Sequence, residues 1–251
     1  MKATILTYHH VATPPLHHPR PNLFVSPEEF KSQMEFLGRK GYPVVSLDQI
    51  RSSLLGETSL PDCSVAITFD DGFEDHYEYA FPILKNLGFP ATIFMIAERI
   101  GLKSDSDQSQ GEDRYLSAPQ LKDMAREGIA IGSHSVTHAR LGRISIQEAS
   151  REIADSKKIL EHLLELQVRW FCYPFGNFNP MIAETVREAG YIGATSVIRD
   201  NRLDPSQLYY LPRVMVMPNI SLRRFGYYFS GLYHIIHYHK NRRRWNRALM
   251  P

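Results

Sequence analysis

The sequence has few of the features that define several large protein classes. Its 251 residues include two cysteines, Cys63 and Cys172, too few for a disulfide framework, and we expect both to be buried free thiols. No apolar run approaches the roughly 18 residues of a membrane-spanning helix. The first ten residues lack the apolar stretch of a signal peptide. The remaining class is a globular protein, which we expect in the cytoplasm or peripherally on the cytoplasmic face of a membrane.

Charge is nearly balanced overall but unevenly distributed. The 29 Lys and Arg against 27 Asp and Glu leave a formal charge of +2, which does not indicate a nucleic-acid partner. Residues 222–251 contain seven basic residues, no acidic residue and many aromatic ones. This composition suits an anionic membrane surface or a lipid-linked glycan. A terminal helix packed on the domain, with a solvated basic end, is the alternative interpretation.

Short β-type runs alternate with amphipathic helical runs along most of the chain. We expect strands at 3–8, 65–69, 91–96, 129–131 and 170–173, and helices at 27–37, 77–87 and 181–189, with further helices beginning after Ser117 and Ser145. Strands regularly separated by helices imply a parallel sheet with right-handed crossovers. About seven such units predict an α/β fold with a closed or nearly closed barrel, and a doubly wound open sheet is the alternative. Functional residues are then expected beyond the carboxyl ends of strands.

Three of these strand ends carry unusual residues. Strand 65–69 leads into Asp70-Asp71-Gly72, where a plain turn is as good an explanation as a site. Two adjacent carboxylates repel each other, and a nearby cation would relieve that cost. Strand 129–131 leads into a segment with His134 and His138, which can converge on one ion if the segment forms a helical turn. Two imidazoles and a carboxylate make a three-ligand site with open positions for water and substrate.

The third strand end is Tyr173-Pro174-Phe175-Gly176, which by itself reads as an ordinary turn. Gly176 permits a tight bend that would expose the Phe175 N–H, a donor suited to an oxyanion. The aromatic rings offer a wall on which a sugar can stack.

Together, the three segments resemble the polysaccharide deacetylases with a NodB-type domain, carbohydrate esterase family 4. The matched motifs are Thr68 to Gly72, His134 to His138 and Tyr173 to Gly176, and the resemblance covers roughly residues 1–217. It implies a distorted (β/α)7 barrel in residues 1–220, followed by the aromatic and basic tail in 221–251. It also implies a metal-dependent enzyme that removes acetyl groups from N-acetylated sugars of the N-acetylglucosamine type, carried on a polysaccharide, an oligosaccharide or a glycolipid.

The resemblance assigns roles residue by residue. It implies Asp70 as general base, and Asp71, His134 and His138 as ligands of a divalent ion, zinc in the first place and cobalt or nickel as alternatives. Such an ion lowers the pKa of a water molecule and polarises an amide carbonyl. The Phe175 N–H would then meet the oxyanion.

Amide cleavage also needs an acid that protonates the leaving amine, and a histidine suits this role. The Leu-x-His motif that usually supplies it in the family does not follow the third segment here. Tyr8-His9-His10 instead resembles the circularly permuted branch, which includes enzymes acting on poly-N-acetylglucosamine, and implies His9 as the acid. His10 is the alternative, because a shift of one residue changes which side chain faces the site. We expect the other histidines of the domain at the surface or in loops: His17, His18, His76 and His162.

The chain departs from the family pattern at one position. Many members carry an arginine just before the third motif, where this chain has Cys172 and Tyr173. Arg213 could supply that charge from another strand end, and an ordinary exposed arginine is the alternative.

Two other functions are compatible with the sequence. One is a hydrolase of the same fold that acts on a small non-sugar amide or ureide. The other is a non-catalytic module that binds carbohydrate or a membrane.

Overall fold

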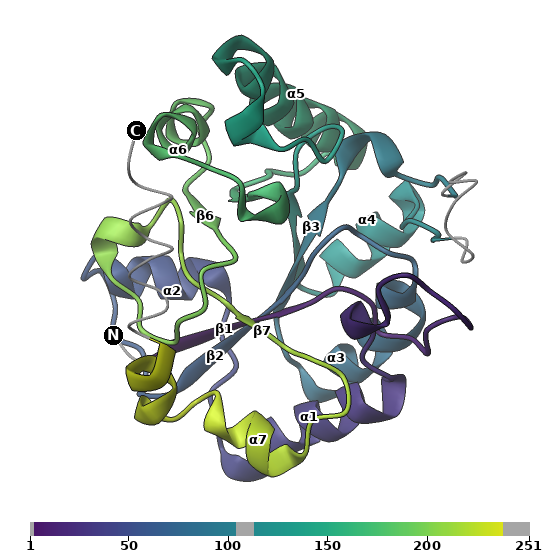
Figure 1. Cartoon of the computed structure of the whole chain (residues 1–251), viewed down its shortest axis with the longest axis vertical. Coiled ribbons are helices and arrows are strands. Elements are labelled where there is room, and N and C mark those ends of the chain that lie inside the picture. The colour runs from purple at the N-terminus through teal and green to yellow at the C-terminus, as the bar shows by residue number, and fades with distance from the viewer. Residues whose placement is uncertain (1–2, 104–112, 238–251) are drawn as a thin grey trace.

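The centre of the structure is a curled sheet of seven parallel strands, in the order β6-β5-β4-β3-β2-β1-β7 (Figure 1). This computed structural model describes residues 3–103 and 113–237. The strands are β1 (Ala3–Tyr8), β2 (Ser64–Phe69), β3 (Ala91–Met95), β4 (Ile129–Ser133), β5 (Trp170–Cys172), β6 (Gly193–Thr195) and β7 (Val214–Met215). The predicted α/β fold of distorted barrel type is therefore confirmed.

The chain bridges the gap between the two edge strands of this sheet. Residues 208–211 run beside β6, where Ala194 N–H donates to Leu208 O and Leu211 N–H donates to Ala194 O. The chain then enters β7, which pairs with β1 at the other edge. This path carries Arg213 from one edge of the sheet to the other and sets it between β1 and β6.

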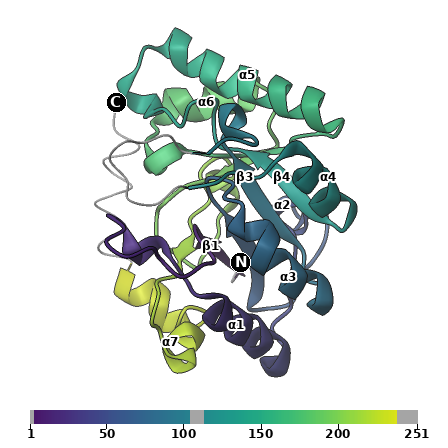
Figure 2. The same cartoon turned by 90° about the vertical axis from the view of Figure 1, so that its right-hand side faces the viewer.

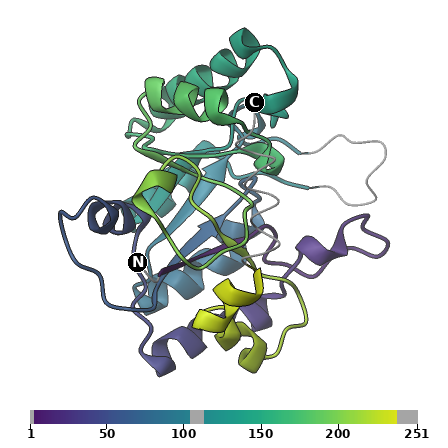
Figure 3. The same ribbon diagram turned by 60° about the vertical axis from the view of Figure 1, so that its left-hand side comes forward.

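Helices surround the strands in the views of Figures 1 and 3. The helices are α1 (Pro27–Lys40), α2 (Leu47–Leu54), α3 (Phe81–Leu87), α4 (Ala118–Arg126), α5 (Ile146–Leu164), α6 (Pro180–Glu188) and α7 (Leu222–Tyr227). The predicted starts of α1, α4 and α5 are confirmed, because Ser26, Ser117 and Ser145 each form a capping box. Helix α1 continues past Gly38, because Gly41, at φ 69°, supplies the left-handed cap.

The helix expected at 77–87 is divided in two. Residues His76–Ala80 form a π-helical turn, and α3 begins only at Phe81. Pro82 lies at the start of α3, and it has no N–H with which to continue the α-helical ladder backward. The wider turn inserts the His76 side chain into the protein, where it is fully buried. The expectation of a surface or loop position was wrong for His76; His18 lies in a loop, as expected, although its side chain is buried.

Alternation along the strands separates two sets of buried side chains. In β1, Leu6 and Tyr8 belong to the larger apolar cluster, in which Tyr8 packs on Phe30 of α1. Ala3 and Ile5 belong to a second cluster on the opposite face, together with Ala66, Phe94, Trp170 and Cys172. Because the side chains of a strand point alternately to its two faces, Thr7 and His9 continue the face of Ile5. The same rule sets Asp70 on the face of Ala66 and Thr68.

The chain after β7 returns to pack against α1. Phe225 of α7 is fully buried, and its ring centroid lies 5.9 Å from that of Phe36. The ring centroids of Phe229 and Tyr42 are 4.7 Å apart. Figure 2 shows α7 beside α1. None of the helices within 3–103 and 113–237 combines the length and hydrophobicity needed to cross a membrane. The domain boundary near residue 220 stays a prediction.

Candidate active site

The carboxyl end of β2 sets two buried acids side by side. Asp70 is 3% exposed and Asp71 is 8% exposed, directly after six buried strand residues. The backbone turns sharply here, since Asp71 and Gly72 have φ values of 70° and 77°. A Cβ on Gly72 would lie 2.1 Å from the Met95 sulfur, so both the space and the conformation require glycine. The turn separates the two carboxylates and gives them different partners.

Asp70 is paired with Arg213. The two terminal nitrogens of the guanidinium lie 2.7 Å from the two oxygens of the carboxylate. The remaining donor capacity goes to Thr7 Oγ1, Thr68 Oγ1, the Ser196 carbonyl and Cys172 Sγ. Burial would raise the pKa of Asp70, but the guanidinium more than offsets this effect and holds the pKa well below its usual range. Asp70 is thus an ionised carboxylate whose orientation is fixed.

Asp71 faces two imidazoles. One oxygen of Asp71 lies 3.5 Å from His134 Nε2 and 3.3 Å from His138 Nε2. His134 Nδ1 donates to the main-chain carbonyl of Cys172 at 2.7 Å, which orients the ring so that Nε2 faces Asp71. Burial, followed by the neighbouring His134, lowers the pKa of His138 to about 4. Both imidazoles therefore present a ligand atom to the same point.

His134 and His138 come together in a loop, and not in the helical turn that the sequence analysis expected. The sequence predicted a helical turn, but residues 134–138 form a loop in which Ser135 and His138 have φ values of 66° and 67°. Ser135 Oγ accepts a hydrogen bond from His138 N–H. The Glu152 carboxylate of α5 accepts hydrogen bonds from the N–H groups of Val136 and Thr137. These bonds hold the loop in a shape that no regular helix would give.

The donor set fits a divalent metal ion. The ligand atoms of Asp71, His134 and His138 all lie within 4.8 Å of one another. A tetrahedral ion with bonds of about 2.0 to 2.1 Å separates its ligands by roughly 3.4 Å, close to the two distances from Asp71. One carboxylate and two imidazoles match the donors found in catalytic zinc sites, which keep a fourth position for water or substrate.

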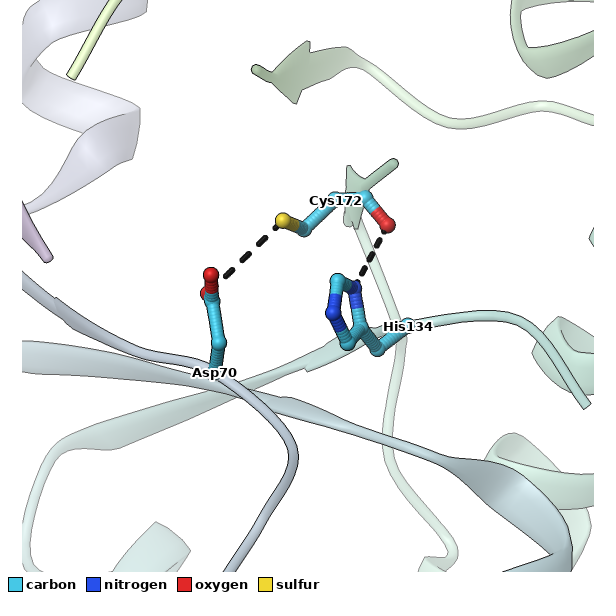
Figure 4. Close-up of side chains that lie close together, drawn as sticks. All are labelled: Asp70, His134 and Cys172. Atoms are coloured by element: carbon cyan, nitrogen blue, oxygen red, sulfur yellow. Dashed lines mark hydrogen bonds between the residues drawn. The ribbon is translucent and has the colours of Figure 1, made fainter. Parts of the chain in front are cut away.

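A second group of possible ligands, Asp70, His134 and Cys172, is also compact (Figure 4). The Cys172 sulfur lies 3.7 Å from an Asp70 oxygen. The Arg213 guanidinium, however, binds both Asp70 oxygens and lies 3.1 Å from that sulfur. A cation placed among these atoms would meet a fixed positive charge. Electrostatics therefore favours the site at Asp71 over the site at Cys172.

The turn Pro174–Gly176, which follows β5, lies beside the candidate metal site formed by Asp71, His134 and His138. Phe175 has a φ of 57°, and its side chain is 44% exposed. Its ring centroid lies 4.4 Å from that of His138, and the Arg140 guanidinium lies 3.9 Å from the ring centroid. Within the described chain, the turn hydrogen bonds use the N–H groups of Gly176 and Asn177, and not that of Phe175. The Phe175 N–H is thus placed in a turn beside His138.

The other residues of this turn point elsewhere. Tyr173 is fully buried, stacks on Phe178 and donates its hydroxyl hydrogen to the Tyr209 carbonyl. Pro174 is buried as well. Of the described residues in the third motif, Gly176 alone lines the cavity beside Asp70. A Cβ there would lie 2.1 Å from Val197, so this position needs glycine.

That cavity has a volume of about 420 Å³ and opens next to the acids. It is lined by Thr7, His9, Asp70, Gly176, Asn177, Phe178, Val197, Ile198, Arg199, Arg213 and Met215. The sequence analysis singled out four of these, His9, Asp70, Gly176 and Arg213. The wall formed by residues 197–199 went unnoticed, because nothing in its composition separates it from an ordinary loop.

His9 and His10 occupy opposite sides of β1. His9 lines the cavity; burial lowers its pKa, against the opposing charges of Asp70 and Asp71. Its buried Nδ1 has no hydrogen-bond partner in the described part of the chain. The ring of His10 is stacked between two phenylalanines, and its Nδ1 lies 2.7 Å from Asp75 Oδ2. A second buried contact, between His76 Nε2 and the His9 carbonyl, holds the backbone at this strand end.

The fold and the site define the class of protein. The family model for polysaccharide deacetylases matches residues 57–194, which is more than half of the chain. The chain belongs to the polysaccharide deacetylase family, a family of hydrolases.

Individual relatives agree with this assignment. The Bacillus subtilis protein YxkH, named as a polysaccharide deacetylase, is 33% identical over 232 residues, 92% of this chain and 77% of the relative. The poly-beta-1,6-N-acetyl-D-glucosamine N-deacetylase of Escherichia coli is 26% identical over 230 residues; the match covers 78% of this chain and about a third, 34%, of that protein. The structure of the Streptococcus pyogenes deacetylase PplD in complex with acetate superimposes with a TM-score of 0.80 at 26% identity, over 92% of this chain and 99% of that one.

Proposed function

We propose that this protein hydrolyses the acetamide group of an N-acetylated sugar of the N-acetylglucosamine type. The observation that carries the proposal is the convergence of Asp71, His134 and His138 within 4.8 Å, next to an Arg213-paired Asp70. The named activity of the E. coli relative, a deacetylase of poly-N-acetylglucosamine, supports this substrate class.

We propose Asp71, His134 and His138 as the ligands of a divalent ion, with zinc ahead of cobalt and nickel for this donor set. When bound, such an ion lowers the pKa of a water molecule and polarises the acetamide carbonyl. The hydrogen bond from His134 to the Cys172 carbonyl orients the imidazole for this role.

Asp70 is the proposed general base. Arg213 keeps the Asp70 carboxylate ionised and restricts its rotation, so that an oxygen is available for the proton of the attacking water. The Phe175 N–H, at the turn beside His138, is the proposed donor to the oxyanion. Gly176 closes this turn against Val197 and so fixes the position of that donor.

His9 is the proposed acid for the leaving amine. It lines the cavity on the same side as Asp70, whereas His10 is held outside by Asp75. In its protonated form, the His9 imidazolium can donate a proton to the amine nitrogen. His9 thus supplies the proton that makes an amine a good leaving group.

The test is acetate release from N-acetylglucosamine oligomers by the full chain loaded with zinc. We expect release that requires the metal and is lost in Asp70→Asn. Activity confined to small amides or ureides would instead support a hydrolase of non-sugar substrates. Glycan binding without any turnover, unchanged by Asp70→Asn, would support a non-catalytic module.

We propose a cytoplasmic or peripheral membrane location, where an N-acetylated sugar or a lipid-linked glycan would be the partner. The described residues that bear on a membrane contact lie between α7 and residue 237.

A further inference from the structure

The last described part of the chain has one buried side and one exposed apolar side. Residues 231–237 are helical. Tyr233 is 3% exposed and lies against Tyr227 and Tyr228, with ring centroids 5.6 Å apart in each pair. Three apolar side chains of this helix face outward, Leu232 at 61%, Ile235 at 63% and Ile236 at 57% exposure. We call these three residues the C-terminal apolar patch.

The sequence around this patch carries charge of one sign. Arg223 and Arg224 lie on α7, and residues 238–251 add five basic residues and no acidic one. Exposed aliphatic side chains together with clustered cations are the combination that binds an anionic bilayer surface. Two copies of the chain would each carry this excess of basic residues, and the repulsion between like charges disfavours a second copy as the occupant.

The patch is tied to the wall of the active-site cavity. Residues 197–199 line the cavity. Oδ1 of the next residue, Asp200, lies 2.8 Å from Nδ1 of His234. Asn201 donates from its amide nitrogen to the carbonyls of Tyr228 and Ser230, at 2.9 and 2.8 Å.

We propose that the C-terminal apolar patch docks this protein on an anionic bilayer surface. Docking brings the cavity wall at 197–199 to the lipid headgroups. The substrate class that follows is an N-acetylated sugar held at the bilayer by a lipid anchor. This last step rests on the proposed deacetylase function, whereas the docking itself does not.

The experiment measures sedimentation of the full chain with vesicles of phosphatidylglycerol and phosphatidylcholine in equal parts, or of phosphatidylcholine alone. We expect binding to the anionic vesicles, weakened by high salt because exposed charges are screened. The triple variant Leu232→Ser, Ile235→Ser, Ile236→Ser is expected to bind about tenfold more weakly. A matched control changes apolar side chains of equal or greater exposure elsewhere, Met181→Ser at 63% and Leu16→Ser at 81%, and is expected to bind as the wild type does.

Three results would overturn the docking proposal. The first is a wild type that stays in the supernatant, the second is a triple variant that binds as tightly as the wild type, and the third is equal binding of the wild type to neutral and anionic vesicles. A dimer in sedimentation velocity that dissociates in the triple variant would assign the patch to a second copy instead. Circular dichroism of the triple variant verifies that its fold is retained.

Activity measurements separate this proposal from the deacetylase function. On soluble N-acetylglucosamine oligomers, the triple variant should match the wild type. On an N-acetylglucosamine lipid held in anionic vesicles, its rate should fall about tenfold, in proportion to binding. Equal rates of both proteins on the anchored lipid would overturn the substrate inference. Absence of acetate from both substrates would reject the deacetylase function and the substrate inference together, and the vesicle result would still decide docking.

Discussion

Arg213 and Asp70 form a buried pair in which two guanidinium nitrogens each lie 2.7 Å from a carboxylate oxygen. Arg213→Met leaves the Asp70 charge buried without a counterion, and we expect the free energy of unfolding to fall by about 3–5 kcal/mol. Arg213→Lys keeps the charge but lacks the planar fork, so a smaller loss is expected. Urea denaturation measures both, with Arg187→Met as the control, because the Arg187–Glu184 pair is exposed. Equal losses at positions 213 and 187 would contradict the assignment.

Asp70→Asn separates the role of the proposed base from that of the proposed metal ligands. The amide cannot accept the proton, so we expect deacetylation to fall by about a thousandfold or more. The metal content should be unchanged, because Asp70 lies outside the Asp71, His134 and His138 group. Elemental analysis and acetate release on the same preparation check both points. A variant that loses metal along with activity would show that Asp70 is a ligand.

His138→Ala removes one of the three proposed ligands. We expect lower metal occupancy, with activity partly restored by excess zinc, because the two remaining donors bind the ion more weakly. His162→Ala is the matched control, since His162 is an exposed histidine of α5. Elemental analysis after dialysis against a chelator measures the difference. Equal occupancy in the two variants would remove His138 from the ligand set.

Metal affinity should depend on pH through one imidazole. Although burial acts to lower it, Cys172 and the two carboxylates raise the pKa of His134 to about 9 in the metal-free protein. A raised pKa means that His134 carries a proton at neutral pH, so the metal must displace it. His138, with a pKa of about 4, is neutral there and adds no competing proton. We expect the affinity to fall about tenfold per unit between pH 8 and pH 6. A competition titration with a coloured chelator tests the slope, and a pH-independent affinity would be the contrary result.

Much of this site follows from local sequence. The acids after β2 and the histidines after β4 stand at strand ends, where a parallel sheet gathers its functional residues. Alternation along β1 also distinguishes His9 from His10, because Ile5, Thr7 and His9 share one face. The starts of α1, α4 and α5 follow from capping, whereas β6, β7, α2 and α7 were not predicted from the sequence.

The remaining parts depend on contacts between distant segments. Arg213 and Asp70 are 143 residues apart, and they meet because the chain crosses from β6 to β7. No local pattern encodes that crossing. The histidine loop is a similar case, since Ser135 and His138 adopt left-handed backbone angles, which are uncommon for residues other than glycine. The hydrogen bonds from Glu152 hold this loop, and they come from a separate helix.

His9 and His10 can be compared by substrates that differ in their leaving groups. An amine leaves only after protonation, whereas the phenolate of an activated acetate ester leaves without a proton. If His9 is the acid, His9→Ala should slow acetamide substrates by about 10²-fold or more, with a much smaller effect on the ester. His10→Ala should affect both substrates equally, because His10 packs between Phe24 and Phe73 and pairs with Asp75 outside the cavity. The ratio of kcat/KM for amide and ester in each variant is the measurement. Equal slowing of both substrates in His9→Ala would assign this histidine a positioning role, since only a proton donor acts selectively on the poorer leaving group.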